Sequence, residues 1–199
     1  MRIAAFAALV VLAGASAVAQ TAAPAPPPKP LTPDIAGHVD WPKAAPGDVD
    51  SVDHLVAALY DVISGPPTRQ RDWNRFRSLF LPSARMGVIR PDAPAKDGKA
   101  ARPSDVFLLT PEMYIERDEP YFKKEGFFEH GIANRVEEFG NLVSVWSTYE
   151  SRHTPEDTKP FARGINSIQI VHAGGRYWVA NILWDDERDG LTLPEKYLR

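Results

Sequence analysis

Apolar residues recur every three or four positions after Asp48, which is the spacing that one face of an α-helix requires. They are Val52, Leu55, Val56, Leu59, Tyr60 and Ile63. A second helix is predicted to bury Trp73, Phe76, Leu79 and Phe80. A third begins at Thr110-Pro111, because threonine caps a helix and proline suits its first position. Three helices are therefore predicted before the last third of the chain.

Alternation of apolar and polar residues replaces the helical spacing in the last third. Residues 127–139 and 142–153 flank Gly140-Asn141, and residues 161–173 and 176–184 flank Gly174-Gly175. Two-residue turns of this composition join the strands of β-hairpins. Shorter strands are predicted at residues 86–89 and 106–109. The sequence thus predicts an α+β domain in which three helices pack on a curved antiparallel sheet.

The first hairpin has one mainly apolar face and one charged face, so its inner face can be assigned. The inner positions are Phe128, His130, Ile132, Asn134, Val136, Val143, Val145, Ser147 and Tyr149. Glu129 is predicted to lie outside, opposite Arg152. His130 is then an imidazole among apolar neighbours.

The second hairpin is apolar on both faces, so a further layer is expected to cover one of them. The face assigned to the interior carries Arg163, Ile165, Ser167, Gln169, Trp178, Ile182 and Trp184. The other carries Ile168, Ile170, Val179 and Leu183. A homodimer packed through this second face is predicted, and an N-terminal segment folding back over it is the alternative.

The N-terminus has the features of a secretory signal peptide. Met1-Arg2 precedes an apolar run over residues 3–12, and Ala17-Val18-Ala19 forms a small-residue cleavage site. The run is too short for stable membrane insertion. Residues 20–47 are rich in Pro and Ala and are predicted to be a flexible linker, with the domain at 48–199. Export is expected, to the periplasm of a Gram-negative host or otherwise to the extracellular space.

Four stretches carry a resemblance to a known superfamily: residues 139–142 (FGNL), 147–152 (STYESR), 163–169 (RGINSIQ) and 175–178 (GRYW). Together they resemble exported bacterial members of the nuclear transport factor 2-like superfamily, which includes SnoaL-like proteins, ketosteroid isomerases and scytalone dehydratases. The resemblance implies a cone-shaped α+β fold with a pocket between the helices and the concave sheet, and it favours dimers. It implies no single reaction, because this fold serves many functions.

The catalytic residues of the isomerases do not transfer to this chain, and those of the dehydratases transfer at most in part. Ketosteroid isomerases have a carboxylate base after the second helix, where residues 83–88 contain none, and Ser167 falls where their late-strand acid would lie. Tyr60 is nearer the end of the first helix than the family tyrosine. Scytalone dehydratases use two histidines, and only His130 is predicted to point inward. The known isomerase acid pair is therefore absent.

Candidate site residues follow from the predicted inner faces. His130 is the candidate acid or base, because imidazole titrates near neutral pH, and the alternative is a hydrogen-bonded core histidine. Arg163 is expected opposite Asp186, as a carboxylate-binding group or as a cross-strand ion pair. The candidate ligand-binding residues are Tyr60, Asn134, Ser147, Tyr149, Arg163, Ser167, Gln169, Trp178 and Trp184.

Composition and charge narrow the function classes. The 199 residues include no cysteine, which excludes thiolate chemistry, and the histidines lack metal-ligand spacing. A net charge of −3 disfavours nucleic acid as a partner. No metal or cofactor is expected. The leading hypothesis is binding of a small, mainly apolar or aromatic molecule in the pocket. The alternatives are a cofactor-free lyase or isomerase using His130, and a non-catalytic structural module whose interior is filled; a cavity of about 300 Å³ or more would favour binding.

Overall fold

The computed structural model describes residues 35–96 and 99–199, which lie within one compact unit, Thr32–Arg199. The predicted signal peptide and the first part of the predicted linker lie outside the described residues. From the rest of the linker, Trp41 donates its indole N–H to the Phe80 carbonyl at 3.0 Å. Short 3₁₀ helices lie on either side of Trp41, at Ile35–Gly37 and Pro46–Asp48.

Three α-helices precede most of the sheet, as predicted: α1 (Val52–Ile63), α2 (Trp73–Leu79) and α3 (Pro111–Phe122). Each begins at a residue whose side chain accepts a backbone N–H of the first turn, namely Ser51, Asp72 and Thr110. Such caps satisfy amide groups that the helix itself leaves unbonded. Pro120 lies inside α3 without ending it.

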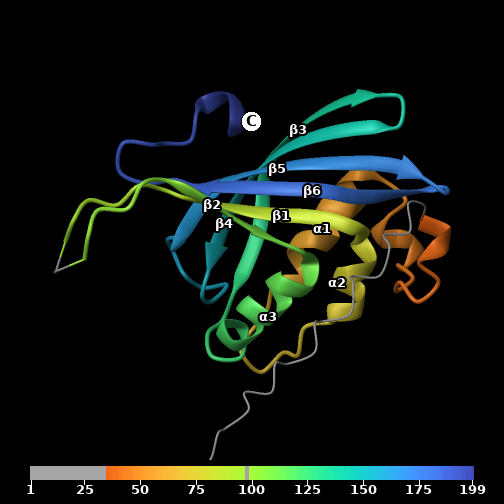
Figure 1. The fold of residues 1–199 in the computed structure, drawn as a ribbon, viewed down its shortest axis with the longest axis horizontal. Coiled ribbons are helices and arrows are strands. Elements are labelled where there is room, and N and C mark those ends of the chain that lie inside the picture. The colour runs from red at the N-terminus through yellow and green to blue at the C-terminus, as the bar shows by residue number, and fades with distance from the viewer. Residues whose placement is uncertain (1–34, 97–98) are drawn as a thin grey trace, which may run out of the picture. The chain divides into compact units, whose positions relative to one another are not determined.

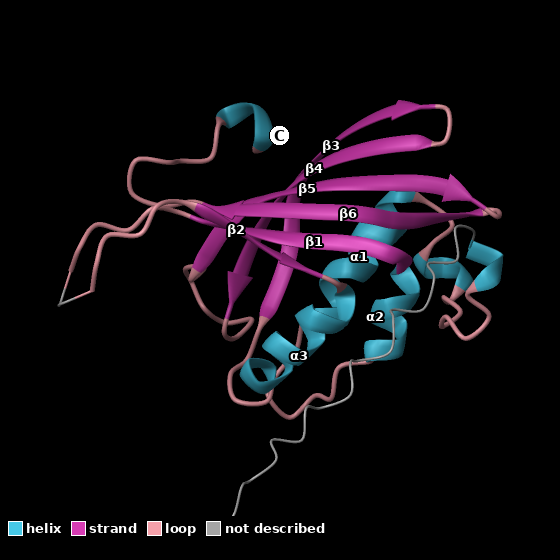
Figure 2. Ribbon diagram, viewed as in Figure 1, coloured by secondary structure: helices cyan, strands magenta, loops and turns pink. Residues whose placement is uncertain are grey.

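The sheet has six strands: β1 (Phe80–Arg90), β2 (Asp105–Leu109), β3 (Phe128–Phe139), β4 (Leu142–Arg152), β5 (Ala162–Ala173) and β6 (Arg176–Asp186). Their order is β2-β1-β6-β5-β4-β3, and every pair is antiparallel except β1 with β6. All three α-helices lie against the same face of the sheet (Figures 1 and 2). The predicted α+β fold is confirmed.

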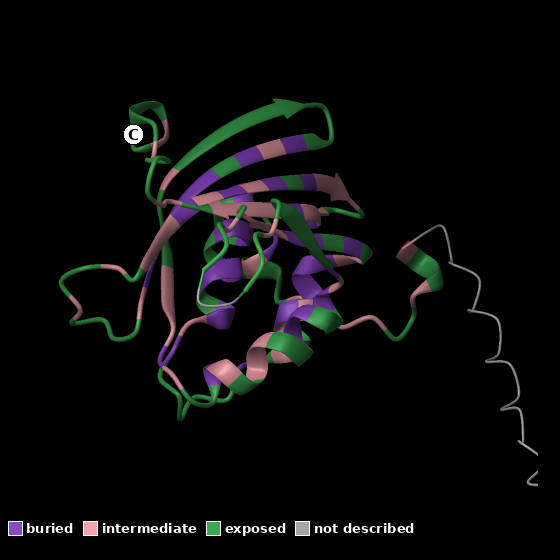
Figure 3. Cartoon of the chain, turned by 60° about the vertical axis from the view of Figure 1, so that its left-hand side comes forward, coloured by how far each residue is buried: buried purple, intermediate pink, exposed green. Residues whose placement is uncertain are grey.

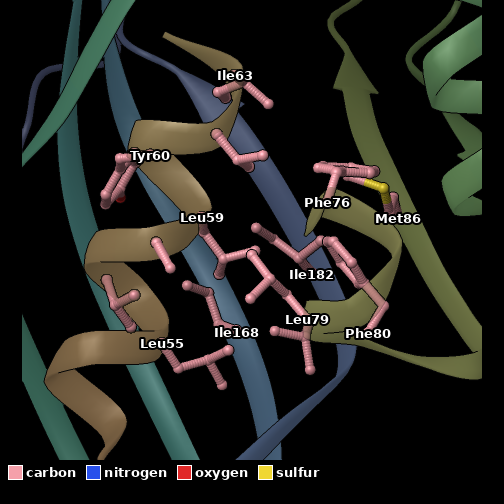
Figure 4. Packing of buried hydrophobic residues seen from close by; sticks show 14 of the residues in the cluster. Leu55, Leu59, Tyr60, Ile63, Phe76, Leu79, Phe80, Met86, Ile168 and Ile182 are labelled. Atoms are coloured by element: carbon pink, nitrogen blue, oxygen red, sulfur yellow. The ribbon is translucent and has the colours of Figure 1, made fainter. Parts of the chain in front are cut away.

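The core lies between this face and the helices. Leu55, Leu79, Phe80, Val145 and Val179 are fully buried there. Figure 4 shows Leu59 of α1 directed toward Ile168 and Ile182 of the sheet, with Phe76 and Phe80 beside them. Tyr60 lies on the other flank of α1.

A β-bulge in β3 changes the predicted faces of the first hairpin. Ala133 pairs with Thr148 and Gly131 pairs with Tyr149, so Ile132 is an extra residue in β3. Since one extra residue turns the remainder of a strand over, Glu129 points toward the helices and His130 is exposed. The prediction that His130 points inward is wrong. Beyond the bulge the strand extends past the helices, and Asn134 and Val136 are exposed as well (Figure 3).

The inner face of β5 is the opposite of the predicted one. Val145, Ser147 and Tyr149 of β4 pair with Ile168, Asn166 and Gly164, which places the even-numbered residues of β5 under the helices. Ile168 and Ile170 are 1% exposed. The β4–β5 register could not be predicted, because residues 153–161 do not form a two-residue turn.

A second bulge at Ala180 separates two tryptophans that were predicted to share a face. Gln169 pairs with Asn181 while Ile170 pairs with Val179. Trp184 consequently lies on the inner face opposite Asn166, whereas Trp178 pairs with Val171 on the outer face.

The outer face of the sheet is partly covered by the C-terminal segment. The Thr148 hydroxyl donates to the Tyr197 carbonyl at 2.5 Å, and the rings of Trp146 and Tyr197 stack with centroids 5.3 Å apart. Of the residues predicted to form a dimer face, Ile168, Ile170 and Val179 are instead in the core, so that assignment is wrong. The homodimer itself stays a prediction.

Candidate functional site

A cavity of about 240 Å³ lies between the inner face of the sheet and the helices. Its wall comes from α1, α2, α3 and every strand except β2, together with residues just before β3 and β5. Ten of its residues are aromatic: Tyr60, Phe76, Phe80, Tyr114, Tyr121, Phe122, Phe127, Tyr149, Phe161 and Trp184. A cavity of about 150 Å³ is enough to hold benzene, so this one has room for a single-ring ligand. The interior is therefore not completely filled, but the cavity is smaller than the roughly 300 Å³ expected of a ligand-binding pocket.

Glu129 places a carboxyl group in the cavity wall. It is half-buried, and its Oε2 accepts a hydrogen bond from the Ser151 hydroxyl at 2.6 Å. Burial raises the pKa of Glu129 to about 7, the Ser151 hydrogen bond opposes the rise, and the negative charge of Asp186 adds to it. At neutral pH Glu129 can accordingly either accept or give up a proton.

Tyr149 and Asp186 form a second polar group of the cavity wall. The phenol of Tyr149 donates a hydrogen bond to the Asp186 carboxylate. Burial raises the pKa of Tyr149, and the Asp186 charge raises it further. A Cβ at Gly164 would clash with the hydroxyl of Tyr149. Glycine at this position therefore lets the phenol cross β5 and reach β6.

Tyr60 forms a third polar group, which is closed off from solvent. Its hydroxyl lies 2.6 Å from the buried Ser147 Oγ and accepts a hydrogen bond from Asn166 Nδ2 at 3.1 Å. Burial raises the pKa of Tyr60 to about 12, against the opposing effect of these two hydrogen bonds. The ring packs against β3, where a Cβ at Gly131 would lie 3.0 Å from Tyr60 Cε2.

Helix α3 contributes the cation of the cavity wall. Arg117 binds Asp118 through two hydrogen bonds of 2.8 and 2.6 Å, so its charge is already paired. Its guanidinium also lies over the Tyr114 and Phe107 rings. Glu129 and Asp186, by contrast, form no ion pair with any residue that the structure describes.

The structure brings only part of the predicted site together. Tyr60, Tyr149 and Trp184 line the cavity, and Ser147 lies directly behind Tyr60. His130 and Asn134 are exposed on β3.

The remaining predicted residues lie elsewhere. Ser167 is on the outer face, where Gln169 donates to Ser144 at 3.0 Å, and Trp178 lies outside both the cavity and the core cluster. Arg163 is not opposite Asp186, which pairs with Gly164 because of the bulge at Ala180. It instead forms ion pairs with Glu150 at 3.3 Å and Glu187 at 3.4 Å.

Sequence reasoning missed Glu129, Ser151, Asn166 and Asp186 as components of the site. One signal was available for Glu129: a glycine inside a strand, here Gly131, often marks a bulge. A bulge at that place moves Glu129 to the inner face. Asp186 was noted only as a partner of Arg163, and nothing local indicates that Tyr149 reaches it.

Within residues 35–96 and 99–199, no three or more histidine, aspartate or glutamate side chains are grouped so that they could hold a metal ion. None of the helices in these ranges is long and apolar enough to span a membrane.

Comparison of the sequence with family models and with curated proteins gives no match. Among solved structures, the chain is similar to a protein of unknown function with a cystatin-like fold from Nostoc punctiforme (7% identity, 68% of this chain and 88% of that chain, TM-score 0.49). It is also similar to a putative dehydratase from the nuclear transport factor 2-like family of Streptomyces avermitilis (11%, 71% and 96%, TM-score 0.45). A putative ketosteroid isomerase from Kribbella flavida matches at 13% identity over 78% and 98% of the chains, with a TM-score of 0.39. The solved structures that this chain resembles thus include members of the superfamily whose likeness was noted in the sequence.

Proposed function

We propose that this protein binds a small, mainly apolar molecule in the cavity between the helices and the sheet. The observation that carries the proposal is a cavity of about 240 Å³ with ten aromatic residues and a few polar groups in its wall. Ligand sites are typically apolar concave pockets in which a few polar groups fix the orientation of the ligand. The volume favours a ligand of about one ring over a steroid-sized molecule. Export through the N-terminal segment remains part of the proposal.

Filling the cavity tests this function directly. Ala162 lines the cavity at the start of β5, and Ala173 lies at the other end of the same strand, outside it. Indole, a planar apolar molecule, is titrated calorimetrically into the wild type, Ala162→Phe and Ala173→Phe. We expect Ala162→Phe to weaken indole binding about tenfold or more, since the new ring occupies the ligand's volume. Ala173→Phe should bind like the wild type.

Equal indole affinity in the two variants would contradict binding in this cavity. A second measurement needs no chosen ligand: small molecules are extracted from the purified wild type and from Ala162→Phe and identified by mass spectrometry. A molecule that copurifies with the wild type and is lost in Ala162→Phe supports the proposal.

A second candidate function is proton transfer, and the raised pKa of Glu129 favours it. A carboxylate with a pKa near 7 beside an apolar cavity can act as a general base at neutral pH. It would take a proton from the carbon next to a carbonyl group, leaving the electron pair delocalised onto the carbonyl oxygen. If Ser147 donates to the Tyr60 hydroxyl, the Tyr60 phenol keeps its own proton for that oxygen. This assigns to Glu129 the role that the sequence suggested for His130.

Hydrogen–deuterium exchange separates the two residues. Cyclohexanone is incubated with protein in D₂O, and loss of its α-proton signal is followed by NMR. Glu129→Gln should reduce exchange to the buffer rate, whereas His130→Gln should retain the wild-type rate, since His130 is exposed. Exchange no faster than in buffer with the wild type, or an equal loss in both variants, would remove this candidate.

A further inference from the structure

The charges in the cavity wall do not balance, and this imbalance bears on the ligand. Four ionisable side chains other than tyrosine line the cavity: Arg117, Asp118, Glu129 and Asp186. Arg117 and Asp118 neutralise each other through two hydrogen bonds. Two carboxyl groups are left without a basic partner among the described residues.

These two carboxyl groups are partly satisfied by neutral donors. Glu129 accepts one hydrogen bond, from Ser151, and Asp186 accepts one from Tyr149. An ionised carboxylate has about four acceptor positions, so each retains acceptor capacity that these contacts do not use. The two groups also repel each other, because the charge of Asp186 disfavours ionisation of Glu129. A positive charge between them would relieve the repulsion and use the spare acceptors.

The rest of the wall suits the same type of ligand. Tyrosine, phenylalanine and tryptophan rings attract a cation placed over their faces, and they also pack against apolar groups. Both properties are available in one cavity with ten aromatic residues. A neutral ligand leaves the carboxylate repulsion in place, and an anion increases it.

On the basis of the proposed binding function, we infer that the ligand is a small organic cation: an amine attached to an apolar body of about one ring. Its ammonium group binds Glu129 and Asp186, and its apolar body lies among the aromatic residues.

The test compares three ligands of nearly the same shape that differ in charge: benzylamine, benzyl alcohol and benzoate. Each is titrated calorimetrically into the full chain at pH 8. We expect benzylamine to bind about tenfold or more tightly than benzyl alcohol, and benzoate to bind most weakly. Glu129→Gln should remove most of the preference for benzylamine, so that its affinity falls toward that of benzyl alcohol in the same variant. Glu137→Gln, an exposed glutamate on the same strand, is the matched control and should keep the preference.

The pH dependence supplies a readout that does not need a variant. Protonation of Glu129 should weaken benzylamine binding as the pH falls from 8 to 5.5, because benzylamine itself stays protonated over this range. Benzyl alcohol should show no comparable loss. The titratable or charged groups facing the cavity around Glu129 are Tyr60 on α1, Tyr114, Arg117, Asp118 and Tyr121 on α3, Tyr149 on β4 and Asp186 on β6. Burial raises the pKa values of the four tyrosines, which therefore stay protonated throughout.

The outcomes separate this inference from the function on which it rests. If benzyl alcohol binds as tightly as benzylamine, the cavity binds ligands but the cation inference is wrong. If none of the three ligands binds while indole still does, the cation inference is wrong and the binding function stands; if indole also fails to bind, both are wrong. A preference for benzylamine that persists in Glu129→Gln and does not change with pH also overturns the assignment.

Discussion

Two enclosed ionisable side chains of this protein, Arg71 and Glu129, differ in how fully their hydrogen-bonding capacity is used. Arg71 is 4% exposed and donates to four backbone carbonyls, those of Ile63, Gly65, Pro66 and Arg69, at 2.7–3.0 Å. Glu129 receives one hydroxyl hydrogen bond and otherwise faces the cavity.

The difference distinguishes a charge whose hydrogen bonds hold the backbone from a charge that the protein leaves partly unsatisfied. Arg71 stabilises the loop between α1 and α2 through its hydrogen bonds to backbone carbonyls, and it does not line the cavity. Burial lowers the pKa of Arg71, but an arginine remains charged at any physiological pH. Burial of Glu129 instead moves its pKa to a value at which the group can change its charge. A poorly satisfied charge costs stability, and such a cost is typical of functional sites.

The largest effect is expected from removing the well-satisfied charge. Arg71→Ala leaves four carbonyls without their guanidinium donor and should lower the free energy of unfolding by about 3–5 kcal/mol. Arg69→Ala, two residues away, removes an exposed side chain that lies 3.8 Å from Asp61 and should cost less than about 0.5 kcal/mol. Urea unfolding at pH 7 measures both. Similar losses in the two variants would mean that the carbonyl contacts of Arg71 do not fasten the loop.

Glu129→Gln should raise the free energy of unfolding, and by less than Arg71→Ala lowers it. The folded-state pKa of Glu129, about 7, lies above its ordinary value of 4.5, so the folded protein holds the proton more tightly than the unfolded chain. Stability from this group is complete below about pH 4.5, falls as the pH rises to about 7, and stays low above it. Glutamine has no charge to bury, and its amide oxygen can still accept from Ser151. The variant should therefore exceed the wild type by about 2–3 kcal/mol at pH 8 and match it near pH 4.5.

Unfolding free energies at pH 4.5, 6 and 8 give the profile, with Glu137→Gln as the control. If the unfolding free energies of the wild type and Glu129→Gln changed in parallel with pH, Glu129 would have an ordinary pKa. The contrast between Glu129 and Arg71 would then be wrong.

The sequence predicts what is set by neighbouring residues. Thr110-Pro111 starts α3, and the turns at Gly140-Asn141 and Gly174-Gly175 join the strands as expected. A few neighbouring residues determine the cap of a helix and the conformation of a short turn. In the second turn, for example, both glycines have the positive φ that such a turn requires.

The faces of the strands depend on contacts distant in sequence and were predicted less well. The bulge at Ile132 brings Glu129 inside and turns His130 outward, and beside it the Tyr60 ring of α1 packs closely against Gly131. The inner face of β5 follows from its register with β4, which no short turn fixes. A shift of one residue turns every following side chain of a strand to the other face. The bulge in β3 and the β4–β5 register therefore moved most of the predicted site residues out of the cavity.

The smallest expected change in stability concerns two tyrosines of the cavity wall, one whose hydroxyl has buried partners and one whose hydroxyl has an exposed partner. Tyr60→Phe removes the hydroxyl that contacts buried Ser147 and Asn166, leaving both without that partner, and should cost about 1–2 kcal/mol. Tyr149→Phe removes a hydroxyl whose partner, Asp186, is exposed and can bind water instead, so its cost should be below about 1 kcal/mol. Thermal or urea unfolding of both variants at pH 7 gives the difference. A larger loss of stability in Tyr149→Phe than in Tyr60→Phe would contradict this. It would mean that the Tyr149 hydroxyl holds the Asp186 carboxylate in place and that neither water nor an ammonium group replaces it without loss.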